Sequence, residues 1–247
     1  MHNQTKKYYE YANDSYKLFT PDFLESKKLD IYLENNRESL VDFLEKYQEQ
    51  FGSFDKSAQI LEAGCGLGGL SFYLSKMGFY THGVDQSKLA ISMAREINKS
   101  KSLYAKFTGQ DLCNSEASEQ FDIVVDSHLL HCLVDENDRE SYLAFVKNSL
   151  NDDGLFFLET MCYQAKIQIP IGYEFDASFK LYKEIGDQTI PYRKIIDSIE
   201  LEQELKSMGF KIKYLYYHNE LSFDVFSEYK DLNPESLPKT IRLVASK

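Results

Sequence analysis

The sequence predicts an α/β fold with a Rossmann-like, seven-stranded, mostly parallel sheet that carries helices on both faces. The first observation behind this prediction is the alternation of short apolar runs with amphipathic helical patterns from residue 57 onward. The second is a glycine-rich turn, GCGLGG, that directly follows the first apolar run. The third is a pair of apolar segments near the C-terminal end with no helix between them, which we expect to pair antiparallel.

Residues 1–56 are expected to form a helical extension or cap in front of the sheet. Apolar side chains recur 7, 4, 3 and 4 residues apart, the spacing of one helix face, at Leu33, Leu40, Leu44, Tyr47 and Phe51. Gly52 is expected to end this helix. Upstream, tyrosines crowd a short segment before Pro21: Tyr8, Tyr9, Tyr11 and Tyr16.

Seven apolar runs are expected to form the strands of the sheet. They are Gln59–Ala63, a run that ends in Gly83-Val84-Asp85, Leu103–Phe107, Phe121–Val125, Leu155–Glu159, Phe210–His218 and Thr240–Ser246. Helical patterns lie between several of these runs, at Leu70–Met77, Leu89–Ile97, Tyr142–Leu150 and Leu201–Met208. Ser87 can cap the second of these helices.

A stretch at about 163–190 separates the fifth strand from the last helix and shows only weak periodicity. Connections of this length in a compact domain are usually functional lids or disordered segments. Its aromatic residues favour an ordered lid: Tyr163, Tyr173, Phe175, Phe179 and Tyr182. We therefore expect an insertion that covers a ligand site.

The charge balance limits the possible partners. The chain has 28 Lys and Arg against 39 Asp and Glu, a formal net charge of −11, which repels phosphate backbones and anionic lipid heads. We therefore expect no nucleic-acid partner. No apolar run approaches the roughly 20 residues that span a bilayer, so we expect no membrane insertion either. The four cysteines form no CxxC pair and the N-terminus has no signal-peptide pattern, which favours a cytoplasmic protein.

The strongest motif is Ile60-Leu61-Glu62-Ala63-Gly64-Cys65-Gly66-Leu67-Gly68, a strand that runs into a glycine-rich turn and then a helix. Glycines there let the backbone bend sharply and approach a ligand closely. Asp85 follows 19 residues after Gly66, at a strand end, where a carboxylate can accept from both hydroxyls of an adenosine ribose. The loop also satisfies GxGxxG, so by itself it does not separate a dinucleotide site from other adenosine cofactors.

Three features favour a cofactor other than a dinucleotide. Glu62 precedes the first glycine by two residues, where a carboxylate can meet a cationic amino group but would repel a pyrophosphate. Asp111 follows the third strand, where it could accept from an adenine amino group. The expected antiparallel pair at the end of the sheet is a feature that the dinucleotide fold lacks.

In order, the motifs EAGCGLG, GVDQS, GQDL and FDIVVDSHLLHC resemble those of the class I S-adenosylmethionine-dependent methyltransferases, closely over about residues 57–160. The resemblance implies a cofactor-binding methyltransferase domain at 57–247 with a substrate-lid insertion at about 163–190. It implies S-adenosylmethionine as cofactor and a cofactor site made of the turn after the first strand and the ends of the next three. The implied cofactor-binding residues are Glu62, Gly64, Cys65, Gly66, Asp85, Gln86, Asp111, Leu112, Asp126 and Ser127.

His128 and His131 are the candidate catalytic residues, because an imidazole titrates near neutrality and can serve as a general base. No third ligand follows at a zinc-like spacing, so we expect no metal. The stretch after the fourth strand, Asp126-Ser127-His128-Leu129, lacks the Asn/Asp-Pro-Pro-Tyr motif of family members that methylate DNA bases or glutamine amides. The expected acceptor is therefore a small molecule, enclosed by aromatic residues: Tyr8, Tyr11, Tyr16, Tyr163 and Tyr173.

Two other functions remain open from the sequence. The GxGxxG loop is also typical of NAD-type oxidoreductases, and a module could keep the cofactor fold without turnover. The sequence indicates neither the methylated atom, nitrogen, oxygen or another nucleophile, nor an oligomeric state.

Overall fold

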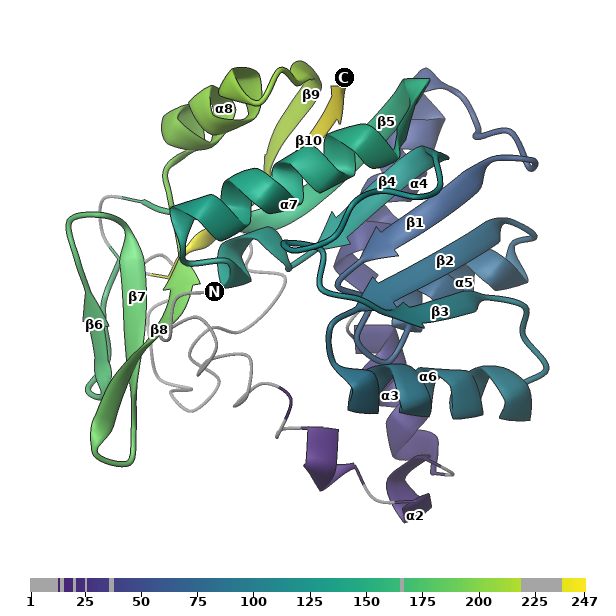
Figure 1. Ribbon diagram of the computed structural model, residues 1–247, viewed down its shortest axis with the longest axis horizontal. Helices are drawn as coiled ribbons and strands as arrows, with labels where there is room; N and C mark the ends of the chain where they lie inside the picture. Colours follow the sequence, from purple (N-terminus) through teal and green to yellow (C-terminus); the bar gives the residue numbers. More distant parts are fainter. Residues whose placement is uncertain are drawn as a thin grey trace.

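The computed structural model describes residues 13, 16–19, 21–24, 26–35, 38–164, 167–218 and 237–247. In this part of the chain a seven-stranded sheet occupies the centre, in the order β3-β2-β1-β4-β5-β10-β9 (Figure 1). Its strands are β1 (Gln59–Ala63), β2 (Tyr80–Asp85), β3 (Lys106–Gly109), β4 (Phe121–Ser127), β5 (Leu150–Cys162), β9 (Lys211–His218) and β10 (Lys239–Ser246). The strands from β3 to β5 run parallel, whereas β10 is antiparallel to both β5 and β9. The predicted fold class is confirmed.

Helices precede the sheet and alternate with its strands. They are the short 3-10 turns η1 (Tyr16–Leu18) and η2 (Leu130–Cys132), and the helices α2 (Pro21–Leu24), α3 (Lys27–Asn35), α4 (Glu38–Phe51), α5 (Gly69–Lys76), α6 (Lys88–Ser100), α7 (Glu136–Ser149) and α8 (Ser198–Ser207). Gly52 follows α4 with φ of 102°, a conformation that glycine adopts without strain, as the predicted helix end requires. The predicted cap of α6 is present, since the Ser87 hydroxyl accepts from the Ala90 amide at 3.1 Å.

Helices cover both faces of the sheet (Figure 1). Successive residues of β4 point to opposite faces, so Val124 packs with α7 and α8 while Ile123 and Val125 pack with α4 and α5. A further cluster fills the space between α3, α5 and α6, around the buried ring of Phe107. Burial on both faces explains why the central strands are nearly continuous apolar runs.

Strands β3 and β5 differ most from the sequence prediction. β3 begins at Lys106, later than the predicted Leu103, because the Leu103 amide donates to the Asn98 carbonyl and so belongs to the turn that follows α6. Ser102 has φ of 52° there, the left-handed turn that commonly ends a helix. β5 extends from Leu150 to Cys162, because pairing with the long strand β10 continues as far as Cys162.

The expected lid is a second sheet rather than an irregular loop. Strands β6 (Tyr173–Phe175), β7 (Lys180–Ile185) and β8 (Gln188–Lys194) form three antiparallel neighbours, which we call the lid sheet (Figure 1). Gly186, with φ of 60°, opens the two-residue turn of the β7–β8 hairpin. Its core contains Met161 of β5, so the lid sheet is anchored on the central sheet; the other buried members are Tyr173, Leu181 and Ile195.

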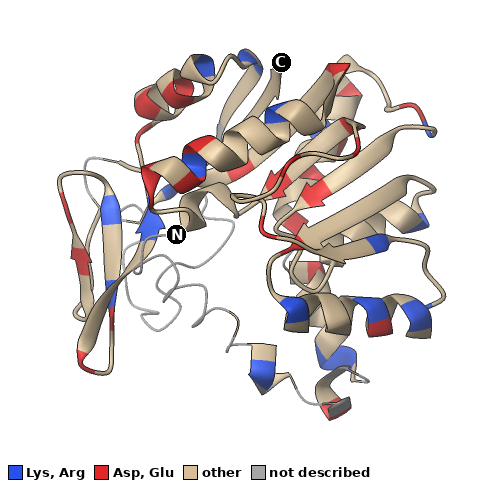
Figure 2. Ribbon diagram, in the orientation of Figure 1, with Lys and Arg blue, Asp and Glu red and all other residues tan. Residues whose placement is uncertain are grey.

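Figure 2 shows acidic residues on α8 and at the start of α7, close to basic residues at the end of β8. A hollow between these elements is lined by Glu136, Glu140, Glu200 and Glu204, with Lys194 in ion-pair contact with Glu136 at 3.2 Å. The described surface here is rich in negative charge, as the net charge of −11 leads one to expect.

Candidate active site

The turn after β1 is built from glycines in the left-handed region. Gly64 and Gly66 have φ of 73° and 50°, and the Gly64 and Cys65 amides both donate to the Val84 carbonyl of β2. A Cβ at position 64 would lie 3.0 Å from Cβ of Leu129, so this residue, two positions after β4, packs directly on the turn. Glycine is therefore required here both by backbone conformation and by close approach.

Asp85 ends β2 beside this turn. Its Oδ2 accepts from the Gly66 amide at 2.9 Å and its Oδ1 accepts from the Ser87 amide at 2.8 Å. Burial raises the pKa of this carboxyl, and the two amide bonds oppose the rise. Each carboxylate oxygen can accept more than one hydrogen bond, so Asp85 retains acceptor capacity toward a ligand.

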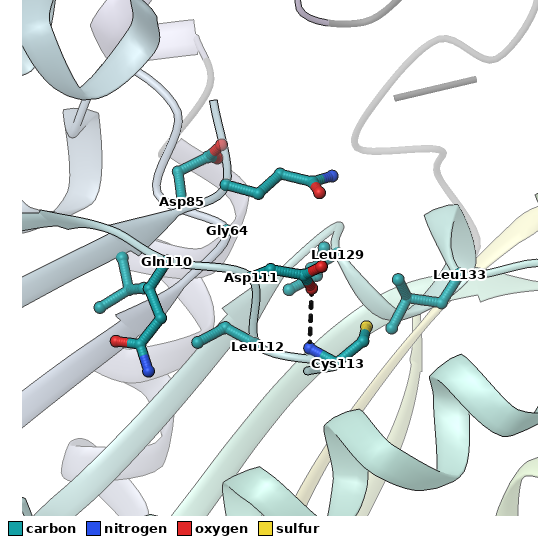
Figure 3. A pocket seen from close by; sticks show the side chains of 10 residues that line it. Gly64, Asp85, Gln110, Asp111, Leu112, Cys113, Leu129 and Leu133 are labelled. Atoms are coloured by element: carbon teal, nitrogen blue, oxygen red, sulfur yellow. Dashed lines mark hydrogen bonds between the residues drawn. The ribbon is translucent and has the colours of Figure 1, made fainter. Parts of the chain in front are cut away.

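Asp111 lies in the loop that follows β3, across the same cleft (Figure 3). Its Oδ1 accepts from the Cys113 amide at 3.0 Å, the dashed bond in the figure, and its Oδ2 accepts from the Asn114 side chain at 2.8 Å. These bonds hold the carboxylate in the lining of the cleft.

The structure brings five of the predicted cofactor residues to this one cleft: Gly64, Asp85, Gln86, Asp111 and Leu112. Sequence reasoning missed the remaining lining residues, which are Val84, Gln110, Cys113, Leu129 and Leu133. Three of them, Val84, Gln110 and Cys113, are next to predicted cofactor-binding residues in the sequence. Leu129 and Leu133 reach the cleft because η2 folds back toward the turn after β1, and no local pattern signals that contact.

Glu62, Cys65 and Asp126 were predicted to be at the site, but they do not line the cleft. The Glu62 carboxylate accepts from the Ser71 amide and hydroxyl, at 2.9 and 2.5 Å, and burial raises its pKa to about 7. Cys65 is buried and packs in the cluster around α3, α5 and α6.

Asp126 is fully buried at the carboxyl end of β4. It accepts from the amides of Leu129 and Leu130 and from the Tyr142 hydroxyl, at 2.7, 3.0 and 2.8 Å. Burial raises the pKa of Asp126 to about 7. Its contacts fix the loop that carries the two candidate histidines, which is an indirect contribution to the site.

Ser127, the last residue of β4, presents a different feature. Its hydroxyl oxygen is buried and has no hydrogen-bond partner in the part of the chain that the structure describes. Buried hydroxyls are normally satisfied, so an unmatched one at the carboxyl end of a parallel strand marks a place where a ligand can bond.

His128 follows Ser127 in an unusual conformation, with φ of 80°. Its amide donates to the Glu159 carbonyl at 3.1 Å, and its Nε2 lies 2.9 Å from Oε1 of the Glu159 carboxylate. Burial lowers the pKa of His128, and the Glu159 carboxylate opposes that shift. A positive φ is costly for a residue with a Cβ, so these contacts hold the imidazole against strain.

His131 is 2% exposed and sits in η2 rather than on an α-helical face shared with His128. The Met161 amide points at its Nδ1 at 3.4 Å, and the Thr160 hydroxyl lies 3.1 Å from the same atom. Nδ1 is therefore an acceptor and the ring proton is on Nε2. Burial and the nearby Arg193 lower the pKa of His131 far below its usual value, so the ring is neutral.

The predicted tyrosine wall is only partly within the described residues; Tyr8 and Tyr11 lie outside them. Tyr16 lies over the glycine turn after β1, since a Cβ on Gly66 would be 2.9 Å from the Tyr16 hydroxyl oxygen. Tyr163 stacks on Phe175 at 5.5 Å between ring centroids, and Tyr173 is buried in the core of the lid sheet.

The described residues contain no group of three or more His, Cys, Asp or Glu side chains placed to hold a metal ion. Within the same ranges, none of the helices combines the length and apolar character that crossing a membrane requires.

A family model described as a methyltransferase domain matches residues 60–154, which carry the cleft. An uncharacterized methyltransferase of Schizosaccharomyces pombe is 30% identical over 100 residues, 40% of this chain and 68% of that protein. A ubiquinone biosynthesis O-methyltransferase of Glaesserella parasuis is 29% identical over 192 residues, 74% of this chain and 77% of that protein. A putative methyltransferase of Geobacillus is 28% identical over 118 residues, about half of each chain (47% and 47%).

Solved structures show the same fold. An S-adenosylmethionine-dependent methyltransferase from Clostridium acetobutylicum superposes with a TM-score of 0.63 at 17% identity, over 89% of this chain and 97% of that one. The 1,6-didemethyltoxoflavin N1-methyltransferase of Burkholderia thailandensis, solved with its acceptor and S-adenosylhomocysteine, gives 0.61 at 16% identity, over 97% and 90%. With the matched family model and relatives, the glycine turn and the two strand-end aspartates identify this chain as a member of the S-adenosylmethionine-dependent methyltransferases.

Proposed function

We propose that this protein transfers a methyl group from S-adenosylmethionine to a nitrogen, oxygen or other nucleophile of a small molecule in the cytoplasm. S-adenosylmethionine is the cofactor of the family. The observation that carries the proposal is the cleft, because Asp85 at the end of β2, Asp111 in the loop after β3 and the glycine turn after β1 meet there.

The residues present fit this cofactor. Two carboxylates, from Asp85 and Asp111, suit the ribose hydroxyls and the adenine amino group, and apolar side chains of Leu112, Leu129 and Leu133 suit the ring. The buried Ser127 hydroxyl at the end of β4 adds a polar atom that has no hydrogen-bond partner among the described residues. We assign Gly64, Gly66, Gln86, Asp126 and Ser127 to the surroundings of the same ligand. Glu62 and Cys65 are assigned to the layer of residues that supports the turn from inside.

When bound, the cofactor supplies an electrophilic methyl group on a positively charged sulfur. The protein then has to align the acceptor, exclude water and, where the acceptor carries a proton, remove it. His128 is the proposed base, since it precedes the cleft residue Leu129 in the chain and its side chain is 22% exposed, whereas the ring of His131 is enclosed. His131 is proposed to shape the site from behind, at 5.9 Å between the two ring centroids.

The acceptor pocket is proposed to lie between the N-terminal segment and the lid sheet. Tyr16 stands at the cofactor turn, and Arg193 of β8 is close enough to influence the pKa of both histidines. The aromatic side chains of Tyr163 and Tyr173 stiffen the lid sheet. Tyr8 and Tyr11 are proposed from the sequence alone to line the acceptor pocket. The Burkholderia neighbour is named for the N1-methylation of 1,6-didemethyltoxoflavin, and several relatives are named ubiquinone biosynthesis O-methyltransferases, which supports a small acceptor.

Two measurements test this function. Calorimetric titration with S-adenosylhomocysteine should show binding, and NADH should show none, which separates the proposal from an oxidoreductase. A methyl-transfer screen against amines, phenols, carboxylates and thiols should then find turnover. Binding without turnover of any acceptor class would favour a non-catalytic cofactor-binding module.

A further inference from the structure

We propose that Glu159 is a positioning residue that holds His128 as the tautomer with its proton on Nε2, so that Nδ1 takes a proton from the methyl acceptor. The inference rests on the proposed function and adds to it. It narrows the acceptor to a group that must lose a proton for methyl transfer, such as a hydroxyl or an ammonium group. It also gives a role to a charged cluster in the core that cofactor binding does not require.

The charge state of the Glu159 carboxyl group decides which nitrogen of His128 carries the proton. The Glu159 side chain is fully buried near the carboxyl end of β5, at the register position of Ser127 in β4. Oε2 accepts from Nε of Arg242 at 2.7 Å and from the Ser39 hydroxyl at 2.5 Å, while Oε1 faces the His128 ring at 2.9 Å. A buried carboxylate so surrounded is ionised, because a buried charge is tolerated when it is paired and bonded.

Arg242 forms a buried ion pair with Glu159. Its guanidinium is 1% exposed and also donates to Asp42 at 2.9 Å and to the Ser39 carbonyl at 2.7 Å. Ser39 and Asp42 belong to α4, so the helical extension, β5 and β10 meet in one ion-pair cluster. The predicted N-terminal cap is thus joined to the candidate base by hydrogen bonds.

The chemistry of imidazole then fixes the position of the ring proton of His128. An ionised carboxylate can only accept, so the ring nitrogen that faces Oε1 must carry the hydrogen. In the neutral ring the lone pair is then on Nδ1. The charged and titratable groups that act on His128 come from several elements: Glu159 on β5, His131 on η2, Arg193 on β8 and Arg242 on β10. Of these, Glu159 is within hydrogen-bond distance of the Nε2 atom.

The backbone supplies independent support. His128 keeps a left-handed φ of 80° while its amide bonds to the Glu159 carbonyl. Main chain and side chain of His128 are therefore both fixed by the same residue. Strain of this kind persists where the surroundings hold a side chain for function.

The test is nitrogen-15 NMR of the histidine rings in the intact protein, which reports each tautomer without any acceptor. His128→Asn identifies the His128 signals, because asparagine tolerates the left-handed φ. The wild type should show a neutral His128 with its proton on Nε2. In Glu159→Gln the amide NH₂ can face the ring, so the proton should move to Nδ1.

Asp42→Asn is the matched control. It removes one negative charge from the Arg242 side of the same cluster and leaves the Glu159 carboxylate in place, so the tautomer should stay on Nε2. A wild-type ring protonated on Nδ1, an unchanged tautomer in Glu159→Gln, or an equal change in Asp42→Asn would overturn the inference. If Glu159→Gln does not fold, the wild-type spectrum still decides.

Turnover gives a second readout once the screen yields an acceptor. Glu159→Gln should lower kcat by about 10²–10⁴-fold, the usual value of a general base, and leave KM for S-adenosylmethionine unchanged. Failure of the proposed function is distinguishable, because it would appear as absent binding of S-adenosylhomocysteine with the tautomer as inferred. Normal turnover in Glu159→Gln would overturn the positioning role alone.

Discussion

The carboxylate of Glu62 on β1 accepts two hydrogen bonds from Ser71, one from its amide at 2.9 Å and one from its hydroxyl at 2.5 Å. Ser71 lies in the first turn of α5, where helix amides lack partners within the helix. The pair therefore ties the strand before the glycine turn to the helix after it. Burial nevertheless raises the pKa of Glu62 to about 7 from an ordinary 4.5.

This raised pKa predicts a pH-dependent stability. Between about pH 4.5 and 7 the folded state holds a proton on Glu62 that the unfolded chain releases, so the stabilisation is lost as the pH rises. Glu62→Gln keeps an oxygen for both Ser71 bonds but does not titrate. The difference in melting temperature, wild type minus variant, should fall from pH 5 to pH 8. A difference that stays constant would show that Glu62 is already ionised across this range.

Asp85 should carry a substantial part of the cofactor affinity. Asp85→Ala removes charge-assisted hydrogen bonds to two hydroxyls, and we expect binding of S-adenosylhomocysteine to weaken by about 1.5–3 kcal/mol. Asp122→Asn is the control, because Asp122 accepts from the Gln59 amide and the Asn151 side chain at the opposite end of the strands. Calorimetry should find the control unchanged; an unchanged dissociation constant in Asp85→Ala would make that residue purely structural.

Gly66→Ala should impair the turn in two ways. Its φ of 50° costs a residue with a Cβ about 1–2 kcal/mol, and the new Cβ would lie 2.9 Å from the Tyr16 hydroxyl oxygen. Adding Tyr16→Phe removes that oxygen and should recover part of the lost melting temperature. Gly78→Ala isolates the backbone cost, since Gly78 has φ of 93° and nothing within 4 Å of its missing Cβ. A double variant no more stable than Gly66→Ala would show that the contact with Tyr16 is not limiting.

Local signals made much of this fold and cleft predictable. The positions of Asp85 and Asp111 follow from a simple rule, since both end or follow strands of a parallel sheet and the carboxyl ends of such strands share one edge. The β7–β8 hairpin was missed, although Gly186 and Asp187 form a two-residue turn of the kind that favours hairpins. Its strands have few fully buried positions, so the alternation that marks a strand is faint.

The ion-pair cluster behind His128 could not be predicted in the same way. Glu159 is 31 residues from His128 and 83 from Arg242, and their contact depends on β5 lying between β4 and β10. The sequence does contain one usable signal, because Glu159 ends an apolar run at the same sheet edge as Asp85. Its partner in α4, Ser39, has no pattern of its own that could have been recognised.

The lid sheet supplies the last prediction. Leu181 of β7 is fully buried in the cluster that joins the lid sheet to Met161, and Leu→Ala at such a position costs about 2–5 kcal/mol. Because the cofactor cleft is built from other elements, Leu181→Ala should leave the affinity for S-adenosylhomocysteine nearly unchanged while methyl transfer falls and amide exchange in residues 173–194 accelerates. Leu205→Ala in α8, equally buried but in the core of the main sheet, should destabilise the fold without a selective effect on that segment. Normal transfer by Leu181→Ala, despite faster exchange in the lid sheet, would remove the lid sheet from the acceptor site.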